Sequence, residues 1–230
     1  MTGTEFQQRP VMASAAIAII SGAIAVWILL DAGAQRLGLA GLLVGILVLF
    51  IGFPDDLESA DHRAYAPAGL GGLIAVTGVL LGGVGGISAA QTAQSMPAMA
   101  GLLVLALGLV PLREGWERRC VTAGATLLLI GVMMAGLVQR TSLFLLLLAG
   151  VCVVLAWDAG HHAISIGQQL GRTAETFGAE LPHLAGTIGV GTFGILAALG
   201  LVMVGVDGLP IASLLVLLLS MLLFIGVLLR

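Results

Sequence analysis

The sequence has very little charge, because only 9% of its 230 residues are Asp, Glu, Lys or Arg. A soluble globular domain has roughly a quarter of its residues charged, so this class is excluded. Hydrophobic residues make up 59% of the chain and fall in long runs. A helix of about 20 apolar residues crosses a hydrocarbon core about 30 Å thick. The alternating pattern of outer-membrane strands is absent. We therefore predict an all-α fold, a polytopic transmembrane helical bundle.

Lysine is absent, so the nine basic residues are all arginine, against twelve Asp and Glu. This composition is similar to that of proteins from salt-loving archaea, which bears on the source more than on the role. The two cysteines, Cys120 and Cys152, lie in separate apolar runs and have no CxxC partner. Neither a disulfide framework nor a zinc ribbon is expected, and both residues are interpreted as small packing residues.

Eight apolar runs predict about eight spans in a single integral membrane domain that covers residues 1–230. The runs are 11–30, 37–53, 68–87, 98–112, 120–138, 143–157, 184–206 and 209–229. The first run is longer than the core of a signal peptide, so we expect it to be a retained span. An even number of spans places both termini on one side of the membrane.

The arginines predict which side that is, because basic residues near span ends are retained in the cytoplasm. Seven lie on the side of the termini: Arg9, Arg63, Arg113, Arg118, Arg119, Arg172 and Arg230. Only Arg36 and Arg140 lie on the other side. We expect a multi-pass protein of the cell membrane with both termini in the cytoplasm.

Glycine is abundant, with 34 residues. Lipid is as apolar as leucine, so membrane helices associate where small residues let two backbones approach. Gly78, Gly82 and Gly86 are four residues apart on one face of their run, and a later run contains Gly189 and Gly194. We predict that these glycines pack helices together. The alternative is that they line a path for an uncharged solute.

The middle of every apolar run lacks Asp, Glu, Arg and His. Charged groups inside a bilayer usually mark ion paths or proton relays, so a carrier coupled to protons or sodium is disfavoured. No GxSxG, Walker A or CxxC motif is present, and no GxGxxG stands in a dinucleotide-binding loop. We expect no catalytic residue, no metal site and no cofactor, and nothing indicates that the chain binds nucleic acid.

An acidic loop at 54–67 offers one alternative. It contains Asp55, Asp56, Glu58 and Asp61, and clustered carboxylates can hold Mg²⁺ against a phosphate. A membrane-embedded, metal-dependent transferase that uses Asp55, Asp56 and Asp61 is therefore a possible function. Such enzymes repeat a spaced aspartate motif, whereas this cluster is single, so we favour a solvated acidic loop.

The longest polar stretch is 157–183, and it contains paired histidines. Asp158 and His162 have the i, i+4 spacing that lets two metal ligands share a helix face. However, the zinc peptidase motifs HExxH and HxxEH are both missing. We therefore favour a solvated or helix-capping role over a metal site.

Periodicity says more about this stretch, since its apolar residues recur every three or four positions opposite a polar face. This pattern is typical of an amphipathic helix. We predict one cytoplasmic helix near 160–181 that continues from run 143–157, with only Gly160 weakening the junction. It is expected to end before Pro182.

The order WDAG…A…GxQLGRxAxT…AELxH in this stretch resembles a segment of an uncharacterised family of multispanning membrane proteins from halophilic archaea. The resemblance covers about 30 residues and the general pattern of spans, and it implies no activity. The matched positions are Asp158, Gln169, Gly171, Arg172, Glu175, Thr176, Glu180 and His183.

The leading hypothesis is a non-enzymatic subunit or scaffold of a membrane complex, with its contact surface on the cytoplasmic face. Its partner is another membrane or cytoplasmic protein, or a second copy of the chain. The candidate contact residues are His161, Gln168, Arg172, Glu175, Arg113, Arg118 and Arg119. A channel or carrier for an uncharged solute is the alternative, ahead of the transferase.

Overall fold

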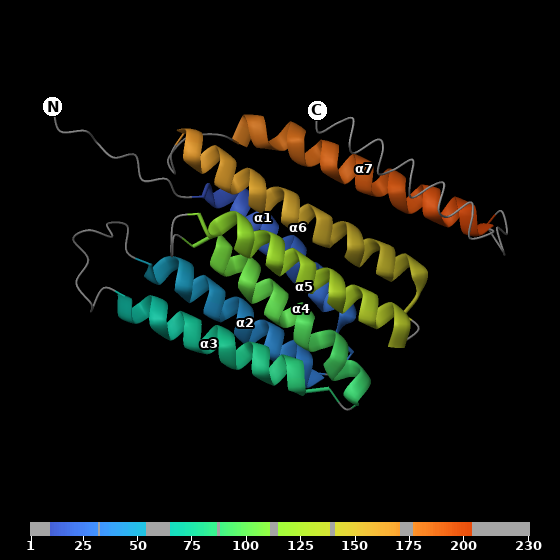
Figure 1. The fold of residues 1–230 in the computed structure, drawn as a ribbon, viewed down its shortest axis with the longest axis horizontal. Helices are drawn as coiled ribbons and strands as arrows, with labels where there is room; N and C mark the ends of the chain where they lie inside the picture. The colour runs from blue at the N-terminus through green and yellow to red at the C-terminus, as the bar shows by residue number, and fades with distance from the viewer. Residues whose placement is uncertain are drawn as a thin grey trace. The chain divides into compact units, whose positions relative to one another are not determined.

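The structure, a computed structural model, describes residues 10–31, 33–53, 65–86, 88–110, 115–138, 141–170 and 177–203. These ranges contain seven α-helices and no strand (Figure 1). The helices are α1 (Met12–Leu29), α2 (Gly33–Gly52), α3 (Ala66–Val84), α4 (Ala89–Gly108), α5 (Glu117–Val138), α6 (Leu143–Leu170) and α7 (Phe177–Met203). The all-α prediction is confirmed for the described part of the chain.

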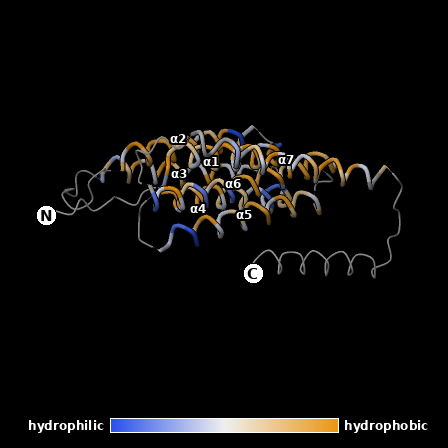
Figure 2. The backbone as a smooth tube through the Cα atoms, turned by 90° about the horizontal axis from the view of Figure 1, so that it is seen from above, coloured by the Kyte–Doolittle hydropathy of each residue, from blue (hydrophilic) through white to orange (hydrophobic). Residues whose placement is uncertain are grey.

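The helices α1 to α6 are all long and apolar enough to cross a membrane. Hydrophobic residues predominate along them (Figure 2), and many large apolar side chains on their outer faces are exposed, as are Leu37 and Ile51. In α7 the apolar stretch Ala185–Gly200 is shorter, and run 209–229 lies outside the described residues. Six such helices indicate a multi-pass membrane protein, although they do not establish the predicted count of about eight.

The chain divides into two units, residues 1–191 and 192–230. In the first unit, successive helices from α1 to α6 run antiparallel (Figure 1). The beginning of α1 therefore meets the last turns of α6, where Val11 N donates to Ala163 O at 3.1 Å. We call the end that holds the first turns of α1, α3 and α5 the Arg118 end, and the opposite end the Gln94 end.

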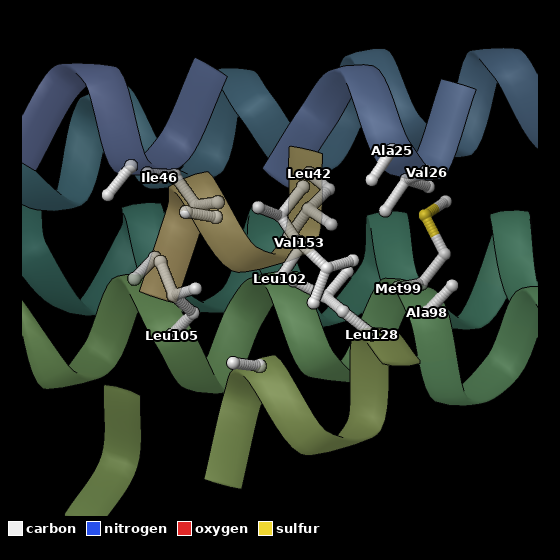
Figure 3. Packing of buried hydrophobic residues seen from close by; sticks show 14 of the residues in the cluster. Ala25, Val26, Leu42, Ile46, Ala98, Met99, Leu102, Leu105, Leu128 and Val153 are labelled. Atoms are coloured by element: carbon white, nitrogen blue, oxygen red, sulfur yellow. The ribbon is translucent and has the colours of Figure 1, made fainter. Parts of the chain in front are cut away.

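The hydrophobic core lies around α1, which contacts α2, α4, α5 and α6. Its buried residues lie on one face, since Ala18, Ala25 and Leu29 recur at helical spacing. Figure 3 shows buried hydrophobic side chains that meet there, and those labelled come from α1, α2, α4, α5 and α6. They are Ala25, Val26, Leu42, Ile46, Ala98, Met99, Leu102, Leu105, Leu128 and Val153.

Glycines bring α2 and α3 into the most extensive helix contact of the bundle. A Cβ atom added to Gly38 would overlap the main chain of Gly82, and one added to Gly45 would overlap that of Ala75. Between α4 and α5, a Cβ on Gly101 would lie 2.7 Å from the carbonyl oxygen of Gly124. These distances leave no room for side chains, so the two backbones themselves are in contact.

The fourth helix begins earlier than the sequence predicted, at Ala89 instead of residue 98. Ser88 caps it, since Gln91 N donates to Ser88 Oγ at 3.2 Å. Pro97 lies inside the helix, although proline removes one main-chain hydrogen bond there. The polar residues before Pro97 lie outside the predicted run 98–112, but in the fold Gln94 and Ser95 find hydrogen-bond partners on other helices.

The predicted amphipathic helix near 160–181 is divided between two helices. Helix α6 continues without a break from run 143–157 through Gly160 to Leu170, and an added Cβ on Gly160 would lie 2.8 Å from the Val121 side chain. Gly160 therefore provides a close helix contact. Residues 171–176 lie outside the described residues, and α7 contains Pro182 in its interior. The expected end before Pro182 is wrong, because α7 continues through Pro182, its sixth residue, although proline removes one main-chain hydrogen bond there.

Candidate functional site

Two segments with predicted contact residues, the beginning of α5 and the end of α6, meet at the Arg118 end. Arg118 is in the first turn of α5, and Ser165 and Gln168 are in the last turns of α6. The Arg118 Nη2 atom donates to Ser165 Oγ at 3.2 Å and to Gln168 Oε1 at 3.4 Å. Since Ser165 and Gln168 are three residues apart, they lie on one helix face and can share one guanidinium nitrogen.

A second polar contact lies one turn deeper along the same two helices. Thr122 Oγ1 and His161 Nε2 are 3.1 Å apart, and the hydrogen-bond direction depends on the histidine tautomer. The His161 ring also packs against that of Trp157, with centroids 5.0 Å apart. We name the five residues Arg118, Thr122, His161, Ser165 and Gln168 the α5–α6 seam. Arg118, Thr122 and Gln168 are exposed, so the seam is on the surface.

The length of α6 places the seam near a membrane boundary. At about 1.5 Å per residue, its 28 residues extend for about 42 Å, which exceeds a hydrocarbon core of about 30 Å. If α6 spans from its first residue, His161 comes at the far edge of that core, and Ser165 and Gln168 come beyond it. In that case the exposed polar side chains would face the headgroup region or water.

The turn before α5 is built locally by Gly115. This residue has φ of 79°, a conformation that suits glycine because it has no Cβ atom. Gly115 N donates to the Glu117 carboxylate at 3.0 Å. This turn comes directly before α5, so it determines how far along the bundle axis Arg118 lies.

Asp158 joins α6 to α7 at the same end. Thr187 Oγ1 donates to Asp158 Oδ2 at 2.6 Å, and both side chains are partly buried. The sequence did not predict this pair, because the two residues are 29 positions apart and hydroxyls are common in membrane helices. Among the described residues, no group of three or more His, Cys, Asp or Glu side chains is arranged to hold a metal ion.

Several predicted residues lie outside the described residues. They are Asp55, Asp56, Glu58 and Asp61 of the acidic loop, the contact candidates Arg113, Arg172 and Glu175, and Gly171 and Thr176. The side chains of Glu180 and His183 are likewise outside the described part. Arg119 is described and exposed beside Arg118.

The five packing glycines have different surroundings. A Cβ on Gly78 or Gly82 would overlap Leu42 or Met99, respectively, and one on Gly86 would lie 2.8 Å from Gln91 Cβ. A Cβ on Gly189 would meet no described atom within 4 Å. Gly194 belongs to the second unit, and within the described part of that unit it has no such neighbour.

Sequence reasoning missed two buried amides at the Gln94 end. Gln35 and Gln94 have no exposed surface. Gln94 Nε2 donates to Leu29 O, at the end of α1, at 2.8 Å, while its Oε1 has no hydrogen-bond partner among the described residues. A buried amide needs such bonds, because leaving it unpaired in an apolar medium costs several kcal/mol.

Two further contacts complete the Gln94 end. Ser95 Oγ, also buried, lies 2.7 Å from Gln91 O in its own helix and 3.0 Å from Gly83 O on α3, so its one hydroxyl hydrogen is shared between these two carbonyls. Arg36 Nη2 donates to Leu30 O at 3.3 Å, and its Cζ atom lies 4.9 Å from the centroid of Trp27. The sequence of 89–97 could have indicated that Gln94 and Ser95 lie in a helix, because amides and hydroxyls recur there at helical spacing beside an apolar run.

The family assignment agrees with an uncharacterised membrane protein. The profile of a family of unknown function (DUF7519) matches residues 66–225, and the chain belongs to this family. The match includes α3 to α7 and therefore the whole α5–α6 seam. No curated protein and no solved structure gives a significant match.

Proposed function

We propose that this chain is a non-enzymatic subunit or scaffold of a membrane complex and that the α5–α6 seam is part of its contact surface. The observation that carries the proposal is the hydrogen bond between Arg118 and Gln168. These two residues are 50 positions apart in the sequence. The sequence predicted both of them, separately, as candidate contact residues. Their meeting on one surface supports a single contact region.

The same proposal includes the finer topology. The chain has eight spans in one integral membrane domain, both termini are in the cytoplasm, and the Arg118 end is on the cytoplasmic side. The support is the distribution of arginine, with seven residues on this side and two on the other. A halophilic archaeal origin is supported by the absence of lysine. The partner is another protein or a second copy of this chain.

The channel alternative has less support from the described helices. The glycines of α2 and α3 contact the facing backbone, as Gly38 contacts Gly82, and contact of this kind fills the space that a solute path would need. The transferase alternative depends on Asp55, Asp56 and Asp61, which lie outside the described residues. Changing Asp55 and Asp56 to Asn and measuring bound Mg²⁺ tests it directly.

Site-specific photo-cross-linking in native membranes tests the proposal. A benzophenone amino acid at Gln168 should give one discrete protein adduct, because this side chain is exposed at the seam. The same group at Leu37, exposed at the Gln94 end, is the control and should give none. An adduct of twice the chain's mass identifies a second copy as the partner.

The charge of the seam should control this adduct. Arg118→Glu should reduce its yield about fivefold, which corresponds to about 1 kcal/mol of contact free energy. Arg36→Glu makes the same charge change at the other end and should leave the yield unchanged. Protein adducts that are equal at Gln168 and Leu37, or lipid adducts alone, would disprove a protein contact at the seam.

A further inference from the structure

The exposed side of the α5–α6 seam combines guanidinium groups, tryptophans and an apolar track. We infer that it binds an anionic lipid, with the lipid phosphate at Arg118 and Arg119 and an acyl chain along α5 and α6. This site goes beyond the proposed function and does not require a protein partner, although the lipid would occupy the membrane edge of the same surface.

The hydrogen bonds of Arg118 leave it ready to bind an anion. Its Nη2 atom is occupied by both Ser165 and Gln168, whereas Nε and Nη1 have no hydrogen-bond partner among the described residues. Two neutral acceptors therefore orient the guanidinium without neutralising its charge. A planar guanidinium held in this way presents its remaining N–H groups in a geometry that suits phosphate oxygens.

The surroundings of Arg118 add positive charge at the surface. Arg119 is exposed next to it, and both belong to the first turn of α5, where the helix dipole favours an anion. The two acidic side chains described near this end are already engaged, Glu117 by Gly115 N and Asp158 by Thr187 Oγ1. No ion pair to either arginine is found among the described residues.

Tryptophans place this charge at the level of the headgroups. Trp116 is 53% exposed immediately before α5, and Trp157 is 43% exposed on α6. Tryptophan is enriched at membrane–water interfaces because its ring is apolar and its N–H is polar. Guanidinium groups at this height lie where lipid phosphates are, so a lipid headgroup fits the site better than a soluble anion.

An apolar track continues from the arginines toward the Gln94 end. On α5, the exposed residues Thr122, Leu129 and Met133 follow Arg118 at helical spacing. On α6, Val154 and Trp157 are exposed beside the same seam. A lipid with its phosphate at Arg118 would place its ester region near Thr122 and its acyl chain over Leu129 and Val154.

Native mass spectrometry of the full-length protein in detergent, titrated with phosphatidylglycerol or phosphatidylcholine, tests this inference. The protein should retain phosphatidylglycerol preferentially. Arg118→Gln should weaken that binding about fivefold, as should Arg119→Gln, because each arginine near a membrane surface contributes a factor of about this size. Arg36→Gln is the matched control, because Arg36 is also exposed and lies against a tryptophan. It should change nothing, because Arg36 lies at the Gln94 end, away from the seam.

Salt and phosphate provide tests that need no variant. The preference for phosphatidylglycerol should decrease between low and high salt, because exposed charges are screened. Inorganic phosphate at millimolar concentration should not displace the lipid, since it lacks the acyl chain. Displacement by phosphate would identify a soluble-anion site and overturn the lipid assignment.

Equal retention of the two lipids, or equal losses in Arg118→Gln and Arg36→Gln, would also overturn the inference. The protein contact is tested separately, because the lipid titration uses purified protein and the cross-linking uses native membranes. Loss of the Gln168 adduct in Arg118→Gln with unchanged lipid binding would reject the lipid site and leave the protein contact standing.

Discussion

The two ends of the bundle use polar side chains in opposite ways. At the Gln94 end, the side chains of Gln94 and Ser95 are buried and bond to main-chain carbonyls: Gln94 to that of Leu29, and Ser95 to those of Gly83 and Gln91. At the Arg118 end, polar side chains bond to one another across α5 and α6, and several of them are exposed. Polar residues thus join helices inside the bundle at one end and form a surface at the other.

This difference separates a structural role from a binding role. A buried side chain bonded to a carbonyl has an apolar environment and a fixed partner, so its loss weakens the fold. An exposed side chain exchanges its partner with water at little cost, so its loss affects stability less and leaves its remaining hydrogen-bonding groups available to a ligand. Substitutions at the Gln94 end should therefore change stability, and those at the Arg118 end should change binding.

The largest effect is expected for Gly38→Leu, near the Gln94 end. A side chain there would overlap the main chain of Gly82 and separate α2 from α3. We expect a loss of about 3 kcal/mol or more in the free energy of unfolding, measured by SDS titration in mixed micelles. Gly69→Ala is the control at the Arg118 end, where an added Cβ meets no described atom within 4 Å. Equal losses in the two variants would show that the α2–α3 contact is unimportant.

An intermediate effect is expected for Gln94→Leu. The substitution removes the donor to Leu29 O, together with an acceptor that has no described partner, so we expect a loss of about 1–2 kcal/mol. Gln169→Leu is the matched control, because Gln169 is exposed at the other end. Its unfolding free energy should change by less than about 0.5 kcal/mol. The comparison fails if the exposed glutamine matters as much as the buried one.

The smallest effects are expected for serine-to-alanine changes, which compare one residue type at the two ends. Ser95→Ala should lower the unfolding free energy by about 0.5–1 kcal/mol, because the buried Ser95 hydroxyl is shared between Gln91 O in its own helix and Gly83 O on α3. Ser165→Ala should change it by less than about 0.5 kcal/mol, because Ser165 accepts from an exposed arginine. A larger loss for Ser165→Ala would mean that the seam stabilises the bundle.

The predictions that depended on local sequence agree with the described helices. Long apolar runs predicted membrane-spanning helices, and α1 to α6 have the required length and composition. Hydroxyls in membrane helices commonly bond within their own helix, and Thr77 donates to Leu73 O, one turn earlier, at 2.9 Å. Such contacts need only the main chain of the preceding turn, so the sequence near the residue is enough to predict them.

The predictions that failed or were missed depended on distant residues. The start of α4 was placed after its polar residues, because nothing near Gln94 indicates that Leu29, 65 positions away, will accept its hydrogen bond. The expected helix end before Pro182 was wrong because α7 begins at Phe177 and continues through this proline. In each case the deciding partner or boundary was outside the local pattern.

The sequence by itself determined the membrane class and the positions of most helices, because the bilayer selects long apolar segments whatever their neighbours are. It also marked Arg118 and Gln168 as surface residues, since charged and amide groups avoid hydrocarbon. Only the tertiary structure decided that these two residues meet, that Gln94 is buried, and that Gly38 faces Gly82. Helix pairing and rotation set these contacts, and they result from packing among all the helices at once.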